Sequence, residues 1–559
     1  MLRLRTYAYY ALLFVLLFHI LIVCLLCDTP PISRDALIHH LAIPKLWLNH
    51  GGFYEIPWAE YSYYPMNIEV LYLVSLYFKN DIAPKFIHFV FGLGTGLLVF
   101  CYLKQRFDRI WGLLGMIIFI TTPIVVWLST SAYVDLGMTF FTTGSILSFT
   151  KWRGSGYGRL KWLIISSSFM GMALGTKYNA LIVWFFLNLM IAYYYAKDTR
   201  RQLPALKYGF VFFTITLLIA SPWYIKNYLL TGNPFYPLFE SFFRVLHKGG
   251  GGGDGFGAIV QTLEIDFFQR RRMMYGESFW MTILIPVRMF FQGSDDSYRY
   301  FQGVLNPILI IFLPFAVIDR SLRKDTILFM GFSGFFIFMV YFLTAKQVRY
   351  ILPVIPFLSI LAVVGIKNVA DMLRPTDYPF RSQSGGVRNV LTSISRLSLF
   401  AIVVIFLTFN LSYLKNRFDR IQPLKYVLRK ETRDAFLRRH LASYPAIDYI
   451  NQTLSADDRI YLFFLGRRGY YLDRPYRNEH SFGMATVNRM VSAAKSKEEF
   501  EKFIQSLNCT HILMRTDMFV KYLVDNFSKE EIVRFLSLIK ESWKLLYESN
   551  GYALYSLCL

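Results

Sequence analysis

The chain has 559 residues, of which 55% are hydrophobic and 18% aromatic, and it carries a formal net charge of +23. A soluble protein of this length cannot bury so much apolar surface, so the composition excludes an ordinary soluble enzyme and indicates a polytopic membrane protein. The positive charge would suggest nucleic acid as a partner of a soluble protein. Here the basic residues gather in short connections between apolar runs, which favours a role in membrane orientation instead.

The apolar runs predict about eleven membrane spans, since each approaches the roughly 20 residues that cross a bilayer. The first run follows the basic start MLRLR and has no clear small-x-small cleavage site, so we interpret it as a signal anchor. The predicted spans are residues 7–27, 84–103, 110–128, 135–150, 161–175, 179–196, 205–222, 302–318, 325–344, 350–366 and 397–414.

The basic connections predict the orientation of the chain. Under the positive-inside rule they mark alternate cytoplasmic loops near residues 104–109, 151–161, 197–207, 320–324 and 367–396. The outside then receives the loop 28–83, the segment around Asp135, the loop 223–301 and everything after residue 415. We therefore expect the chemistry of the protein on the outer side of the membrane.

The first external loop, residues 28–83, is long for a connector and should have structure of its own. Within it, SRDALIHHLAIPKLWLNHGG predicts a short amphipathic helix that ends at Gly51 and Gly52. The following stretch PMNIEVLYLVSLYF is apolar but too short to span comfortably. Both pieces are suited to lie along the membrane interface.

The second external loop, residues 223–301, contains the glycine run Gly249–Gly253 followed by DGFG. The strand and helix that flank a phosphate-binding loop are missing, so the run predicts a flexible loop tip. The stretch SFWMTILIPVRMFF, interrupted by Arg288, predicts either an interfacial helix or a short re-entrant piece.

The tail after residue 415 has the composition of a small globular α/β domain. The helical stretch SKEEFEKFIQSL alternates with the strand-like stretches RIYLFFLG, THILMR and GYALYSLCL. Its roughly 140 residues suffice for one core. Cys509 and Cys558 lie in this tail, and the sequence leaves open whether they pair.

Two acids are candidates for chemistry. Asp35 follows the first span closely, so its carboxylate lies near the bilayer surface, where it could serve as a general base. An equally good interpretation is an acid at a helix N-terminus that interacts favourably with the helix dipole. Asp135 begins a predicted span, where an acid is costly unless it has a partner, a task or a helix-capping role. If the two outer segments converge, the two carboxylates would flank one cation or one reacting centre.

Histidine and basic residues extend this candidate site. His39 follows Asp35 by four residues and would share its face of a helix, although an interfacial histidine without a task is the commoner case. Lys177, Lys226 and Arg349 lie at the predicted outer ends of spans. Singly, such cations can simply extend to water, but together they form an anion site that suits phosphate.

The order of motifs along the chain resembles the GT-C glycosyltransferases, specifically bacterial members near the protein mannosyltransferase and aminoarabinose transferase groups. The motifs that carry this resemblance are DALIHHLAIPK, YYPMNIEVLY, STSAYVDL, GTKYNA, SPWYIKNYLLTGNPFYP and QVRYILP. The likeness covers about residues 1–415, and the tail looks like the C-terminal region of bacterial relatives. It implies a polytopic α-helical membrane domain over residues 1–415 and an external α/β domain over residues 416–559.

The resemblance also implies an activity. Such enzymes take a sugar from a polyprenyl-phosphate carrier and transfer it, by an inverting displacement, to a protein, lipid or glycan acceptor on the outer face of the bacterial cytoplasmic membrane. It assigns Asp35 to the catalytic position and Asp135 to a supporting or metal-linked position. Many relatives carry an adjacent acidic pair in the first loop, whereas this chain has Arg34, Asp35 and Ala36. This difference leaves open whether a divalent cation, held by Asp35 and Asp135, takes part.

We therefore expect Asp35 and Asp135 to be catalytic and a larger set to bind substrate. The expected substrate-binding residues are His39, His40, Lys45, Tyr64, Glu69, Lys177, Lys226, Arg349 and Tyr350. The expected partners are a polyprenyl-phosphate sugar, an acceptor of open identity and the lipid bilayer, with no nucleic acid. Two alternatives remain: a polyprenyl-linked glycan polymerase or ligase, and a lipid or solute transporter.

Overall fold

The computed structural model describes residues 2–247, 267–319, 321–343, 347–373, 385–478 and 484–557. The glycine run Gly249–Gly253 and Cys558 lie outside the described residues, and so do the predictions made for them. The chain divides into two compact units. The helical unit consists of Met1–Cys27, Pro65–Ile68 and Lys85–Pro423, and the sheet unit of Asp28–Tyr64, Glu69–Pro84 and Leu424–Leu559.

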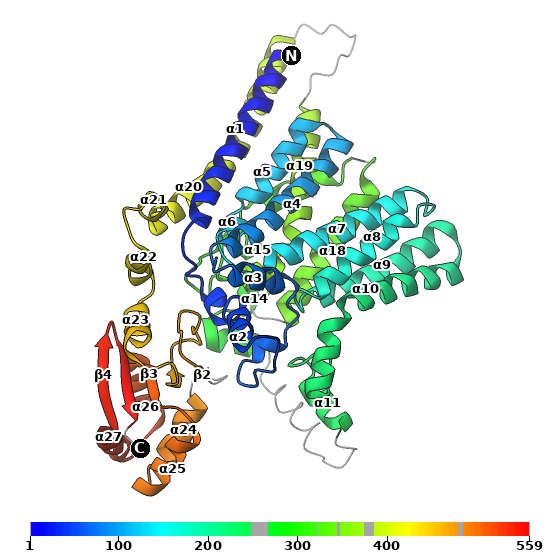
Figure 1. Cartoon of the computed structure of the whole chain (residues 1–559). Helices are drawn as coiled ribbons and strands as arrows, with labels where there is room; N and C mark the ends of the chain where they lie inside the picture. Colours follow the sequence, from blue (N-terminus) through cyan, green and yellow to red (C-terminus); the bar gives the residue numbers. More distant parts are fainter. Residues whose placement is uncertain are drawn as a thin grey trace. The chain divides into compact units, whose positions relative to one another are not determined.

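The helical unit contains the membrane spans (Figure 1). Seven described helical segments are long and apolar enough to cross a bilayer, which confirms a polytopic helical membrane protein. They lie in α1 (Leu2–Cys27), α4 (Ala83–Arg106), α9 (Ala180–Thr199), α10 (Gln202–Thr231), α18 (Arg323–Leu343), η3 (Val348–Val354) continued by α19 (Ile355–Met372), and α20 (Gly385–Ile421).

The count of eleven spans is not confirmed. The run 110–128 folds as α5 (Arg109–Thr121) and α6 (Pro123–Ser129), which are bent by 68°, so the described residues give seven spans, or eight if this pair is one. Proline at the first position of α6 starts the second piece, because it cannot continue the hydrogen-bonding of the first. The runs 161–175 and 302–318 form only α8 (Lys161–Leu174) and the short helices α16 (Ile308–Ile311) and α17 (Leu313–Ala316).

The run 135–150 forms α7 (Asp135–Gly154), a helix enclosed by the bundle. Sixteen of its 20 residues are buried, and many of them are threonine, serine or glycine. Small residues let helices approach closely: Ser145 and Ser166 each donate a 2.8 Å hydrogen bond to the other's backbone carbonyl. A helix buried on nearly all sides resembles a membrane span in sequence, which explains part of the overcount.

The stretch SFWMTILIPVRMFF forms two short helices, α14 (Phe279–Ile283) and α15 (Ile285–Arg288), after α11 (Glu240–His247) and α13 (Phe267–Tyr275). Glu277 is fully buried, and its carboxylate lies 2.6 Å from Arg271 and 3.3 Å from Arg288. Two guanidinium groups offset the cost of burying this acid. The arginine that interrupts the apolar stretch therefore has a structural partner.

The sheet unit confirms the predicted α/β tail. Its five strands are β1 (Ile460–Phe463), β2 (Tyr476–Asn478), β3 (His511–Arg515), β4 (Trp543–Ser549) and β5 (Tyr552–Leu557). They lie in the order β2-β1-β3-β5-β4, parallel from β2 to β3 and antiparallel from β3 to β4. Helices of the tail are α21 (Pro423–Val427), α22 (Arg433–His440), α23 (Tyr444–Thr453), α24 (Met484–Ala493), α25 (Lys497–Ser506), α26 (Thr516–Asn526) and α27 (Lys529–Ser542).

Strand β1 is covered on both faces, as its continuous apolar run predicts. Tyr461 and Phe463 pack into one hydrophobic cluster, whereas Ile460 and Leu462 pack into a second. This alternation follows from the period of two in a strand. The two clusters form the core of the sheet unit.

The first loop adds short helices to the sheet unit. The predicted helix at its start is a π turn, η1 (Ala36–His40), followed by α2 (Ala42–His50), which ends as predicted at Gly51 with a positive φ of 83°. After the turn η2 (Glu60–Tyr63), the stretch PMNIEVLYLVSLYF forms α3 (Asn67–Tyr77). This helix of 11 residues is too short to span, as expected.

Candidate active site

Asp135 has a buried ionic partner in the helical unit. It is the first residue of α7, and its Oδ1 accepts a 2.7 Å hydrogen bond from Nζ of Lys177, which lies just after α8. Only 3% of the Asp135 side chain and 17% of the Lys177 side chain are exposed. The second oxygen, Oδ2, is buried and accepts no hydrogen bond from any described residue. The cost of burying Asp135 is therefore offset on one oxygen, while the other remains available to a ligand.

His88 of α4 fixes the position where α7 begins. Its Nε2 lies 2.9 Å from the backbone N–H of Leu136, so this nitrogen must accept. Its Nδ1 then carries the proton and donates to the carbonyls of Leu128 and Ser131 at 2.9 and 2.8 Å. The imidazole thus caps α7 and holds Asp135 at the end of the turn. We did not select His88 from the sequence, because it lies inside an apolar run.

Arg349 and Tyr350 of η3 join the Asp135 group. Nζ of Lys177 lies 5.1 Å from the centre of the Tyr350 ring, and the Arg349 guanidinium lies 5.0 Å from the same ring. Arg349 also stands 5.5 Å from the ring of Tyr133, and its positive charge acts on Asp135. Two of the three predicted cations, Lys177 and Arg349, therefore lie in one group with Asp135 and two aromatic rings. Their binding of an anion stays a prediction.

Lys226 belongs to a neighbouring polar network. It stands in α10 with its Nζ 5.2 Å from the Trp223 ring. Trp223 donates a 2.7 Å hydrogen bond to Asn67, whose backbone N–H bonds the carbonyl of Gly175. Three motifs of the GT-C resemblance thus meet in the helical unit through structural hydrogen bonds.

Asp35 and His39 lie in the sheet unit. Asp35 is half-buried and immediately precedes the π turn η1. This turn closes with a hydrogen bond from Leu41 to Ala36, five residues apart, so a π turn stands where the sequence predicted an α-helix. The His39 ring stacks on the Tyr61 ring with 4.4 Å between the ring centres, and the rings of Tyr61 and Tyr64 have their centres 5.2 Å apart.

His40 and Glu69 form a buried pair in the sheet unit. Nδ1 of His40 lies 2.7 Å from Oε1 of Glu69, and the two side chains are only 6% and 3% exposed. The pair ties the π turn to α3 and gives both residues a structural task. Their predicted contact with substrate remains a prediction.

Lys45 is also tied to its own unit. Its Nζ donates to the carbonyls of Tyr470 and Leu472 at 2.9 and 3.0 Å and to Oδ1 of Asp473 at 2.8 Å. An ammonium group has three protons, so every donor is occupied. The predicted substrate contact of Lys45 would require one of these bonds to break.

A cavity of about 590 Å³ in the sheet unit adjoins residues that we did not predict. Lys45, Lys79, Asp81, Arg433 and Tyr470 contribute its polar lining. Burial alone would lower the pKa of Arg433, but the paired Asp81 carboxylate outweighs it and the pKa lies above its usual range. Burial, with Asp81 3.2 Å from the hydroxyl, raises the pKa of Tyr470. Asp81 and Arg433 are too far apart in sequence to be linked by any local pattern.

A divalent cation has no ready set of protein ligands in the part of the chain that the structure describes. There, no three His, Cys, Asp or Glu side chains come together in a way that could hold a metal ion. The assignment of Asp35 and Asp135 as metal ligands stays a prediction.

Known proteins share this fold. The apo structure of ArnT from Cupriavidus metallidurans matches with a TM-score of 0.52 and 13% identity, covering 98% of this chain and 97% of that one. ArnT bound to undecaprenyl phosphate matches with a TM-score of 0.51 and 15% identity over 98% of each chain. The archaeal oligosaccharyltransferase AglB from Archaeoglobus fulgidus, in complex with an inhibitory peptide and a dolichol-phosphate, matches with a TM-score of 0.51 and 13% identity. The match covers 98% of this chain and 74% of AglB.

The chain therefore has the fold of ArnT and AglB, as the resemblance seen in its motifs predicts. A model of the dolichyl-phosphate-mannose-protein mannosyltransferase family matches residues 56–243. This region includes Asp135, Lys177 and Lys226, whereas Asp35 precedes it. Among curated proteins, none matches this sequence.

Proposed function

We propose that the protein transfers a sugar from a polyprenyl-phosphate carrier to a protein, lipid or glycan acceptor on the outer face of a bacterial cytoplasmic membrane. The observation that carries the proposal is the similarity of fold, over 98% of each chain, to the ArnT structure that holds undecaprenyl phosphate. The family model and the dolichol-phosphate complex of AglB support the same class of donor.

The proposed reaction is a single displacement. Asp35 removes a proton from the acceptor as the acceptor atom attacks the anomeric carbon of the sugar. The bond from that carbon to the phosphate oxygen breaks, polyprenyl phosphate leaves with the bonding electrons, and the configuration inverts. The half-buried position of Asp35, a few residues after the first span, suits a base that meets a membrane-borne donor.

Lys177 and Arg349 bind the departing phosphate in this proposal, because ammonium and guanidinium groups stabilise the charge that develops on it. Asp135 holds Lys177 in place through its buried ion pair and acts as a positioning residue. His40 and Glu69 act by ordering the loop that carries Asp35, whereas Lys45 stabilises the sheet unit. His39 and Tyr64 belong to the aromatic group that would line the sugar pocket.

The test is release of polyprenyl phosphate from a labelled polyprenyl-phosphate sugar by the purified protein in lipid, with a membrane extract as acceptor source. Asp35→Asn should lower the release rate by about 10²–10⁴-fold, the contribution of a positioned general base. Asp28→Asn is the matched control, because it removes the same charge from an exposed acid of the same loop. A parallel sample with chelator tests the open question of a cation.

Equal release by the parent and by folded Asp35→Asn would remove Asp35 from the catalytic position. No release by the parent with undecaprenyl-phosphate or dolichyl-phosphate sugars would contradict the transferase itself. Retention of the anomeric configuration in the product would exclude the single displacement.

A further inference from the structure

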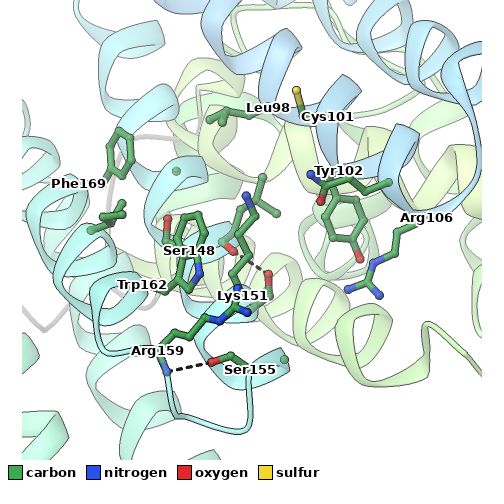
Figure 2. A pocket seen from close by; sticks show the side chains of 16 residues that line it. Leu98, Cys101, Tyr102, Arg106, Ser148, Lys151, Ser155, Arg159, Trp162 and Phe169 are labelled. Atoms are coloured by element: carbon green, nitrogen blue, oxygen red, sulfur yellow. Dashed lines mark hydrogen bonds between the residues drawn. The ribbon is translucent and has the colours of Figure 1, made fainter.

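A second cavity lies in the helical unit, at the opposite end of α7 from Asp135. Its volume is about 730 Å³. The helix rises by about 24 Å from Asp135 to Lys151, so this cavity is well separated from the Asp135 group. The residues that matter for the argument come from α4, α7, the α7–α8 connection and α8 (Figure 2): Leu98, Ser148, Lys151, Arg159, Trp162 and Phe169.

The cavity has one polar and one apolar side. Figure 2 shows Lys151, Arg159 and Ser155 together, with Leu98 and Phe169 farther along the cavity. Nζ of Lys151 stands 4.5 Å from the centre of the Trp162 ring. Cationic side chains beside apolar ones in one cavity match a molecule with an anionic head and a hydrocarbon tail.

The side chains of Lys151 and Arg159 are available to an anionic ligand. Both side chains are exposed, and no carboxylate of the described residues forms an ion pair with either one. Arg106, by contrast, is committed to Asp325 at 2.8 Å. The hydroxyl of Ser148, at the inner part of the lining, is nearly buried and makes no hydrogen bond within the described chain. These groups suit an anionic ligand that brings its own acceptor oxygens.

The location points to the bilayer as the source of this ligand. The connection between α7 and α8 is one of those that the positive-inside rule places in the cytoplasm. The residues that precede the lining residues Leu98 and Ile165 are apolar and exposed, Leu97 by 52% and Ile164 by 44%. A lipid of the inner leaflet can therefore present its phosphate to Lys151 while its acyl chain stays against apolar surface.

We propose that this cavity binds the phosphate head of an anionic phospholipid, with Lys151 and Arg159 contacting the phosphate and with the acyl chains leaving along Leu98 and Phe169. This site is independent of the glycosyl transfer proposed above. It would anchor the α7–α8 connection to the bilayer and thereby fix the helix that carries Asp135 at its other end.

The test is native mass spectrometry of the full-length protein released from vesicles of phosphatidylcholine that contain a minor share of phosphatidylglycerol. The variant Lys151→Gln/Arg159→Gln should retain about tenfold less phosphatidylglycerol than the parent, since each basic residue near an anionic surface contributes substantially. The control Lys104→Gln/Lys197→Gln removes the same charge from the same predicted membrane side but outside the cavity. The variant Lys151→Arg/Arg159→Lys keeps the charge and should retain the lipid.

Equal retention of phosphatidylglycerol by the cavity variant and the parent would overturn the proposal. An equal loss in the control would also overturn it, because the attraction would then be diffuse. If millimolar inorganic phosphate displaced the lipid as effectively as excess phosphatidylglycerol does, the cavity would be a site for a free anion, and the proposed lipid site would be wrong. Circular dichroism of each variant checks that the helices remain folded.

Discussion

Lys45 of the sheet unit and Lys177 of the helical unit both belong to the predicted substrate-binding set, but their surroundings differ. Lys45 gives all three protons to Tyr470, Leu472 and Asp473. Lys177 gives one proton to Asp135 and otherwise faces the Tyr350 ring. A lysine whose donors are filled by its own chain stabilises the fold, whereas one with donors to spare can receive a substrate.

The largest effect is expected when Lys177 is replaced. Lys177→Met should lower the rate of polyprenyl phosphate release by about 10²–10³-fold, the usual effect of losing one donor to a developing oxyanion. It should also destabilise the protein by about 3–5 kcal/mol, because Asp135 is left buried with its charge uncompensated. Release assays and thermal unfolding in detergent measure the two effects.

A second variant separates these two effects. Asp135→Asn/Lys177→Met removes both charges, so it should regain most of the lost stability while release stays low. If the double variant regained the parental rate together with its stability, Lys177 would be structural and would match Lys45.

Lys45→Met tests whether Lys45 has a structural role alone. The protein should lose about 1–3 kcal/mol of stability, since a charged donor gives up its three acceptors, while the rate per folded molecule stays at the parental value. Asp473→Asn removes only the charge of one acceptor, which is mostly exposed, and should cost less. A fall in rate that exceeds the loss of folded protein would return Lys45 to the substrate-binding set.

The smallest expected effect is a dependence on alkaline pH in the sheet unit. Burial and the Asp81 charge raise the pKa of Tyr470, so above about pH 10 the unfolded chain ionises this tyrosine before the folded chain does. Stability should therefore be full below about pH 10 and fall as the pH rises through that value.

Tyr470→Phe tests this expectation. The variant should lose less stability than the parent between about pH 9 and about pH 11, by up to roughly 1.4 kcal/mol per pH unit, which a series of calorimetric melts would measure. Parallel pH curves for the two proteins would show that Tyr470 does not contribute.

Much of the fold could be predicted from the sequence, because length and hydropathy determine which helices can cross a bilayer. Three of the five strands and the helix ended by Gly51 also followed from local patterns. The overcount of spans came from α7, whose apolar residues face neighbouring helices rather than lipid, and from α8 and the helices near residues 308–316, which are too short to cross a bilayer. Hydropathy alone does not distinguish these two environments.

The site was less accessible to sequence reasoning. The ion pair of Asp135 and Lys177 joins residues 42 positions apart, and only the cost of a buried acid signalled that a partner must exist. The three acceptors of Lys45 lie more than 400 positions away in the sequence. No local pattern revealed them, so Lys45 was interpreted as a binding residue. Contacts of this range depend on the tertiary fold and leave no local trace in the sequence.

The hydrogen bonds of His88 have a consequence for charge. Because one ring nitrogen accepts from Leu136 and the other donates to two carbonyls, the imidazole stays uncharged and adds nothing to the electrostatic balance around Asp135. The positive charge that acts on the Asp135 carboxylate then comes from Lys177 and Arg349. The polarity at this end of α7 therefore depends on two strong bases and not on the protonation of a histidine.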